Sequence, residues 1–382
     1  MNERNLKATA FAASALAFAS FGDAFLYPFL PVNNHLVGVP AVWIGVLLSI
    51  NRFVRIFSNS FMVHLFSKFG LRAVMLCAVV LAIVSTAGYA IATGAIIWLI
   101  FRIVWGLSFS AMRIGTLGYS LSHSRRGLAL GISRSLQETG PMAALLLAPF
   151  LLTRFEVRDI FLLLAAFSLP ALWFAWHLPK AEDKTPVTER DLYPGLPSTL
   201  DALTLLSAIV IDGIIVVVLG ILFLQYQDDV SLTAATALAA LYLGYRRVCL
   251  VVFSVAGGWV ADRLGLHKVF NISLALVILG LIVLIAGYIA IGAVVVFTFY
   301  SINAAITPGA VLMQRENSLG RVAQNATWRD IGAAIGTLTG GLLIGSSHIT
   351  MVLSSAVVGL FILLLAHLGV VQRTFRIFCY PK

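Results

Sequence analysis

The chain has 382 residues, of which 60% are hydrophobic and only 11% are charged. A soluble domain carries about 25% charged residues, so this chain has too few polar groups to cover its surface in water. The composition excludes a soluble enzyme and an intrinsically disordered chain, and three cysteines are too few for a disulfide scaffold. We therefore expect most of the surface to face lipid.

Apolar segments long enough to cross about 30 Å of hydrocarbon occur twelve times along the sequence. Their predicted limits are 6–30, 41–66, 73–93, 95–121, 127–153, 159–178, 200–226, 231–261, 269–290, 292–314, 325–347 and 349–371. The first run continues beyond the length of a signal peptide, so we expect an uncleaved first helix. The sequence predicts an all-α integral membrane protein with twelve transmembrane helices.

Lysine and arginine are distributed unevenly between the two sides that twelve crossings define. The loops and tails of one side carry sixteen of them: Arg4, Lys7, Lys68, Arg72, Arg125, Arg126, Lys180, Lys184, Arg190, Arg263, Lys268, Arg315, Arg321, Arg373, Arg376 and Lys382. The opposite loops carry only Arg154 and Arg158. Because cytoplasmic loops are enriched in these residues, we expect both termini in the cytoplasm, beneath a bacterial inner membrane. This topology explains much of the net charge of +10, so no nucleic-acid partner is expected.

The longest polar stretch lies near the middle of the chain and is rich in proline and in charges of both signs, as linkers are. We therefore predict an N-terminal half at 1–178, a cytoplasmic linker at 179–199 and a C-terminal half at 200–382, each half with six helices. The halves resemble each other at an offset of 195 residues, which aligns SKFGLRAV with DRLGLHKV and Arg52 with Arg247. Two parallel repeats predict pseudo-symmetric halves around a central cavity that opens to each side in turn.

The segment GGWVADRLGLHKV ends the eighth predicted helix on the cytoplasmic side. Its Gly258, Asp262, Arg263 and Gly265 match the G-x-x-x-D-R-x-G signature, so the chain resembles the major facilitator superfamily of secondary transporters. The resemblance implies that these four residues form a cytoplasmic gate, in which Asp262 contacts the start of the fifth helix near Arg126. An ordinary helix end with a capping charge is the alternative interpretation.

Two further elements resemble motifs of the same family. Arg102 and Gly106 on the fourth predicted helix resemble an element that the family associates with proton coupling. Gly127, Gly140 and Pro141 on the fifth resemble part of its antiporter motif, which implies export in exchange for protons. Close helix packing, which small residues allow in any membrane bundle, explains the same glycines.

Charged residues inside the predicted spans cost about 2.5–3.5 kcal/mol each at the bilayer centre, unless they meet a partner or a water-filled cavity. Eight are basic and four are acidic: Arg52, Arg55, Arg102, Arg113, Arg134, Arg246, Arg247 and Arg329, and Asp23, Glu138, Asp212 and Asp330. The arginines therefore outnumber the acids by four. We expect Arg134, Arg329 and Asp330 within about two turns of the cytoplasmic helix ends, where snorkelling or local pairing would accommodate them.

The excess of positive charge predicts an anionic substrate, because guanidinium groups bind carboxylate or phosphate through two parallel hydrogen bonds. The candidate substrate-binding residues are Arg52, Arg55, Arg113, Arg246 and Arg247. A structural salt-bridge network with the acids is the alternative, and the sequence leaves both open.

Carboxylates in a cavity change their protonation when a cationic partner is taken or released. The candidates for proton coupling are therefore Asp23, Glu138 and Asp212, and the family resemblance implies that Asp23 works with Arg102. The sequence holds no convincing metal-ligand cluster and no phosphate-binding loop, so we expect no metal, no cofactor and transport driven by gradients.

The preferred hypothesis is a monomeric, proton-coupled exporter of an anionic organic metabolite, such as a carboxylate siderophore. A multidrug/proton antiporter and an organic-anion importer of the same fold are the alternatives. A membrane enzyme is not expected, because no cluster of His, Asp, Ser or Cys lies at a helix interface, and a transport-inactive receptor is a third class.

Overall fold

A computed structural model describes residues 2–40, 42–180, 196–226, 232–314, 319–343 and 348–379. Within these ranges every regular element is a helix. The middle of the predicted linker lies outside the described residues, so its limits at 179 and 199 stay a prediction.

Six helical rods make up the N-terminal half. They are α1 (Asn2–Ala19) with α2 (Phe21–Asn33), α3 (Val42–Phe69), α4 (Leu71–Gly88), α5 (Ala95–Leu121), α6 (Arg126–Arg154), and α7 (Val157–Ser168) with α8 (Pro170–Trp176). The first rod bends by 46° between α1 and α2, next to Ser20, whose hydroxyl donates to the Leu16 carbonyl at 2.7 Å. Such back-bonding within a helix favours bending. A short 3₁₀ turn, η1 (Asn34–Val37), follows α2.

The C-terminal half repeats this arrangement with six more rods. They are α9 (Thr199–Ser207), η3 (Ala208–Ile214) and α10 (Ile215–Tyr226) as one rod, then α11 (Leu232–Leu264), α12 (Leu266–Ile285), α13 (Ile289–Gln314), α14 (Leu319–Leu342) and α15 (Ile349–Cys379). The prediction of an all-α membrane protein is confirmed, and the twelve rods are consistent with two six-helix halves. The largest boundary errors are the start of α14, six residues earlier than predicted, and the end of α15, eight residues later.

The internal repeat is visible in the turns that join corresponding helices. Gly70 precedes α4 and Gly265 precedes α12, 195 positions apart, with φ angles of 79° and 97°. Residues with a Cβ rarely adopt positive φ, so both turns require glycine. Gly265 of the motif is therefore explained by backbone geometry alone.

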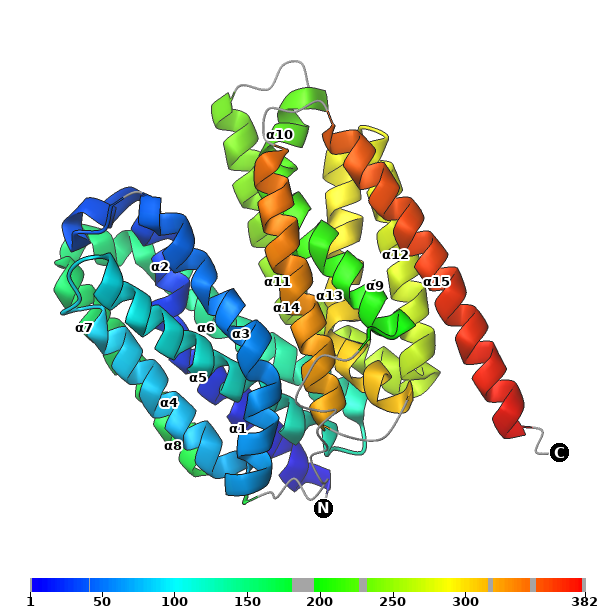
Figure 1. Ribbon diagram of the computed structural model, residues 1–382, viewed down its shortest axis with the longest axis horizontal. Coiled ribbons are helices and arrows are strands. Elements are labelled where there is room, and N and C mark those ends of the chain that lie inside the picture. Colours follow the sequence, from blue (N-terminus) through cyan, green and yellow to red (C-terminus); the bar gives the residue numbers. More distant parts are fainter. Residues whose placement is uncertain are drawn as a thin grey trace.

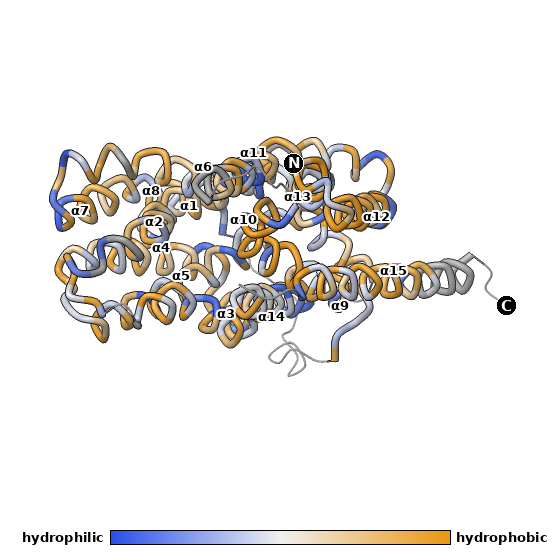
Figure 2. Tube along the Cα trace, turned by 90° about the horizontal axis from the view of Figure 1, so that it is seen from above, coloured by the Kyte–Doolittle hydropathy of each residue, from blue (hydrophilic) through white to orange (hydrophobic). Residues whose placement is uncertain are grey.

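Eight helices of the described chain are long and apolar enough to cross a membrane, or nine if the bent α1–α2 pair counts as one span. The other three long helices are α3, α6 and α14, which carry several of the intramembrane charges. Figure 2 shows α6 beside α11 along one edge of the bundle and α3 beside α14 along the other, so the charged helices lie where the halves meet.

Figure 1 shows the two halves approaching each other at the end where α1 starts and diverging toward the opposite end. The backbones touch at the approaching end, because a Cβ added to Gly258 of α11 would lie 2.1 Å from the Gly127 carbonyl oxygen of α6. The halves are therefore closed at this end, which the sequence predicts to be cytoplasmic.

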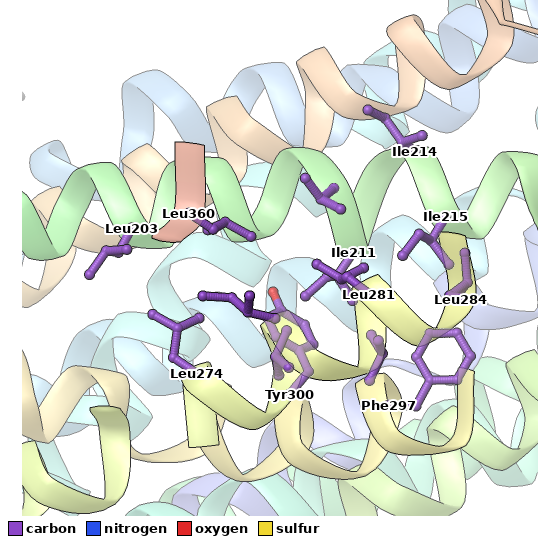
Figure 3. Packing of buried hydrophobic residues seen from close by; sticks show 14 of the residues in the cluster. Leu203, Ile211, Ile214, Ile215, Leu274, Leu281, Leu284, Phe297, Tyr300 and Leu360 are labelled. Carbon is purple, nitrogen blue, oxygen red and sulfur yellow. The ribbon is translucent and has the colours of Figure 1, made fainter. Parts of the chain in front are cut away.

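Each half has its own apolar core. Figure 3 shows the packing in the C-terminal half, where Ile211 and Ile215 meet Leu281 of α12 and Phe297 of α13. All four are fully buried. Most residues of each core come from one half, although Leu130 of α6 joins the core of the C-terminal half and Leu319 of α14 joins a core of the N-terminal half. Rocking of the halves would therefore leave most core contacts within each half intact.

Candidate substrate and coupling site

Asp330 of α14 joins the two halves at the α3–α14 edge. Its carboxylate accepts two hydrogen bonds from Arg113 of α5, at 3.0 and 3.1 Å, and lies 3.5 Å from the Arg55 guanidinium of α3. Asn59 of α3 donates to the same carboxylate at 3.1 Å and accepts from the Ser110 hydroxyl at 2.7 Å. One acid of the C-terminal half is thus held by two arginines of the N-terminal half.

Glu138 of α6 joins the halves at the other edge. It lies 2.8 Å from Arg134, one turn earlier on α6, and 2.8 Å from Arg247 of α11. The Arg247 side chain is 40% exposed although it lies at the middle of a 33-residue helix. Because its guanidinium points at α6, the exposed part borders the space between the halves.

Asp212 lies within the C-terminal half on the π-helical turn η3. It pairs with Arg246 of α11, lies 3.1 Å from Arg329 of α14, and accepts a hydrogen bond from the Tyr300 hydroxyl at 2.7 Å. The neighbouring Gly213 lets η3 touch the backbone of α14. Single π-helical turns inside α-helices occur frequently at functional sites.

Asp23 lies within the N-terminal half on α2. It pairs with Arg102 of α5 and accepts from Asn51 of α3 at 3.4 Å, while the Arg102 Nε–H donates to the Leu47 carbonyl at 2.7 Å. The Arg102 side chain is completely buried, whereas that of Asp23 is 17% exposed. The carboxylate therefore stands between a buried cation and a solvent-accessible space.

Arg52 of α3 has a different environment from the other arginines. Its guanidinium donates to the Thr337 hydroxyl of α14 at 3.0 Å, and among the described residues no carboxylate lies within 4.0 Å of it. Arg52 corresponds to Arg247 under the internal repeat, and both reach across to the opposite half. Arg52 contacts α14 and Arg247 contacts α6, so the two arginines lie on helices at opposite edges of the bundle.

These contacts decide between the two interpretations only in part. A salt-bridge network exists, and it includes four of the five predicted substrate residues: Arg55, Arg113, Arg246 and Arg247. The excess of charge also exists, since eight arginines surround four carboxylates and four positive charges are left.

The predicted depth of Arg329 and Asp330 is wrong. Because α14 begins at Leu319, Asp330 lies eleven residues from the helix start, about 16 Å along the axis at 1.5 Å per residue. Both residues take part in the central network instead of snorkelling. Local pairing of Arg134 with Glu138 is present as expected.

Several polar contacts of the network are not expected from the sequence. Asn59, Tyr300 and Thr337 each bond to a charged group. Each has other polar residues close by on its helix, so no signal in the sequence marks these three.

Of the residues predicted to form a cytoplasmic gate, Asp262 caps a helix of the other half. The Asp262 carboxylate of α11 accepts from the backbone N–H groups of Gly127 and Leu128, both at 2.8 Å. It therefore binds the positive end of the α6 helix dipole, so the expected contact with this helix start is present. Arg263 points elsewhere and lies 3.6 Å from the centre of the Trp259 ring.

The glycines of α6 and α14 allow close helix packing. A Cβ added to Gly140 would lie 1.8 Å from the Ala17 carbonyl oxygen of α1, and one added to Gly336 would lie 2.1 Å from the Ile209 carbonyl oxygen of η3. The first contact lies within the N-terminal half and the second within the C-terminal half. Close helix packing therefore explains these glycines, and no antiporter role is needed to account for them.

A small cavity of about 40 Å³ lies beside the network, with both polar and apolar residues in its wall. Its wall includes Arg113 of α5 together with Tyr300, Asn303, Asn325 and Arg329 of the C-terminal half. A space of this size and polarity holds a few water molecules. It connects the surroundings of Asp330 with those of Asp212.

Comparison with known families identifies the chain. A family model described as Major Facilitator Superfamily matches residues 12–313. The chain belongs to the major facilitator superfamily. It is a multi-pass membrane protein with the fold of a secondary transporter, and the proteins of this family are transporters and not enzymes. A comparison with curated proteins found no match.

Solved structures with the same fold cover almost the whole chain. The human organic anion transporter MFSD10 (TETRAN) has a TM-score of 0.71 at 15% identity, covering 96% of this chain and 99% of that one. The proton:xylose symporter XylE has 0.73 at 14%, covering 96% and 95%. The Escherichia coli fucose:proton symporter FucP has 0.71 at 12%, covering 93% and 97%. Identities this low show the fold alone.

Proposed function

We propose that the chain is a proton-coupled secondary transporter that exports an anionic organic solute, such as a polycarboxylate, by alternating access. The observation that carries the proposal is the charge of the central network, where eight arginines surround four carboxylates. Uncompensated charge is costly inside a bilayer, so an anion that enters the network is stabilised there. A lipophilic cation would meet net repulsion at the same place.

Arg52 and Arg247 are two of the residues that contact the solute, one from each half. Arg52 has a hydroxyl partner in place of a carboxylate, and Arg247 shares Glu138 with Arg134 and is the most exposed arginine of the network. Since each arginine belongs to a different half, an anion bound by both links binding to closure of the halves.

Export and proton coupling rest on further features. Gly127, Gly140 and Pro141 resemble the antiporter motif, and the Asp23–Arg102 pair provides a carboxylate between buried and accessible surroundings. MFSD10 is an organic anion transporter, and XylE and FucP are proton symporters, so the fold accommodates both an anion and a proton gradient. Import of an organic anion, or multidrug/proton exchange, is the alternative that the experiments below distinguish.

The test of the substrate class is counterflow of radiolabelled organic acids and cationic drugs by purified protein in liposomes. We expect counterflow of an acid, and we expect Arg52→Ala or Arg247→Ala to weaken its binding by about 1.5–3 kcal/mol, the contribution of a charged hydrogen bond. Lysine at either position restores binding only in part, because it keeps the charge and loses the planar fork. Counterflow of cations that is unaltered in both variants contradicts the proposal and favours the multidrug alternative.

The proposed topology has both termini in the cytoplasm of a bacterial inner membrane and a cytoplasmic linker between the halves at 1–178 and 200–382. Fusions of alkaline phosphatase, which is active only outside the cytoplasm, are expected to be active after Asn34 and Asp229. They are expected to be inactive after Lys184 and at the C-terminus. Activity at the Lys184 junction would contradict the two-halves arrangement. A monomeric mass in detergent, measured by light scattering, is expected as well.

A further inference from the structure

The Asp330 carboxylate differs from the other three acids of the network in the origin of its partners. Both of its guanidinium partners, Arg55 and Arg113, come from the opposite half of the molecule. The three side chains are at most 14% exposed. Asn59 also reaches Asp330 from the N-terminal half, so this half surrounds the carboxylate with three donor groups.

The donors around Asp330 have the chemistry of a carboxylate-binding site. Arg113 provides one nitrogen that lies within hydrogen-bond distance of both carboxylate oxygens, and Arg55 adds a second positive charge. Asn59 adds an N–H donor that is fixed by its bond from Ser110. In the structure the site is filled by a side chain of the chain itself.

We infer that Arg55, Arg113 and Asn59 form the carboxylate-binding site of the N-terminal half, and that Asp330 is a tethered competitor that occupies it when the cytoplasmic side is closed. The inference rests on the proposed function, because it assigns the bound group of an organic acid to this site. It goes beyond that proposal because a carboxylate of the protein itself, Asp330, takes the place of the substrate in the site.

Exchange of one carboxylate for another keeps the arginines neutralised throughout the cycle. An unpaired buried charge is strongly destabilising, so a site that loses its anion without replacement would resist the change of state. Because α14 belongs to the other half, opening of the cytoplasmic side withdraws Asp330 and leaves the site to a carboxylate from the cytoplasm. Closing returns Asp330 and releases that carboxylate outward.

The inference is tested by measuring how tightly succinate binds to the full-length protein in detergent. Binding is measured from the rise in unfolding temperature with succinate, compared with sodium chloride at the same ionic strength. If Asp330 occupies the site nine-tenths of the time, its removal raises the apparent affinity about tenfold. We therefore expect Asp330→Asn to bind succinate about tenfold more tightly than the unmodified chain, and Arg55→Ala in the same background to remove the gain.

Asp330→Ser gives a second measurement that also removes the competing carboxylate and leaves Arg55, Arg113 and Asn59 in place. We therefore expect the same direction of change as in Asp330→Asn. Asp159→Asn is the matched control for net charge, since Asp159 is exposed outside the network, and succinate affinity is expected to stay unchanged.

Equal or weaker succinate binding in Asp330→Asn overturns the inference. If that variant does not fold, equal or weaker succinate binding in Asp330→Ser overturns it instead. Failure of the proposed function has a separate sign, because the unmodified chain would then show no counterflow of any organic acid in liposomes.

Discussion

Replacement of Gly258 by valine is expected to hold the cytoplasmic side open. A Cβ at this position would lie 2.1 Å from the Gly127 carbonyl oxygen, and neither backbone can move aside while α6 and α11 stay in contact. Overpacking of a core costs about 1–3 kcal/mol, which corresponds to a shift of roughly 5- to 150-fold between two states. Since most core residues of each half pack within that half, the variant is expected to fold and to lose the closed state selectively.

Cysteine labelling measures this shift without knowledge of the substrate. Leu130 of α6 is buried against the C-terminal half in the closed state, so Leu130→Cys reports opening when the three native cysteines are replaced by alanine. We expect fast maleimide labelling in Gly258→Val and slow labelling in the parent.

The control for Gly258→Val lies on the same helix. A Cβ added to Gly244 meets no atom within 4 Å, so Gly244→Val is expected to label as slowly as the parent. Slow labelling of Gly258→Val together with normal counterflow would show that the α6–α11 contact does not control the cytoplasmic side.

The fold was largely predictable because the hydropathy of the sequence indicates the length of each helix and its burial in protein or lipid. Twelve apolar runs predicted twelve rods, and the spacing between Gly70 and Gly265 predicted the repeat that the turns display. The error at the start of α14 has a physical cause. Arg321 and Asn325 make that stretch polar, yet both bond to Asp201 of α9 and so remain inside the helix.

The pairing of charges was less predictable than their number. The sequence and its apolar spans predict that eight arginines and four acids lie inside the membrane. Which arginine pairs with which acid depends on the helices that touch, and these are known only from the packing of the two halves. Asp330 illustrates the difference, because its role follows from α3 and α5 lying against α14. The π-helical turn at Asp212 had no local sequence signal, since its stabilising contact is with Gly336 on another helix.

The Asp23–Arg102 pair is expected to show a large coupling in stability. Removal of one partner from a buried pair costs about 3–5 kcal/mol, whereas removal of both is often close to neutral. Asp23→Asn and Arg102→Met are therefore each expected to lower the free energy of unfolding, and the double variant is expected to regain most of the loss. The Arg102 bond to the Leu47 carbonyl is also lost in the double variant, so recovery is incomplete.

The double variant separates a structural role of this pair from a role in coupling. We expect Asp23→Asn with Arg102→Met to fold, to bind the substrate and to perform counterflow, because these steps need no proton gradient. We expect it to lose proton-driven accumulation in liposomes, because the carboxylate proposed to carry the proton next to the accessible space is gone. Normal accumulation by the folded double variant would assign coupling to Glu138 or Asp212, and the same measurement on Asp212→Asn would then distinguish those two.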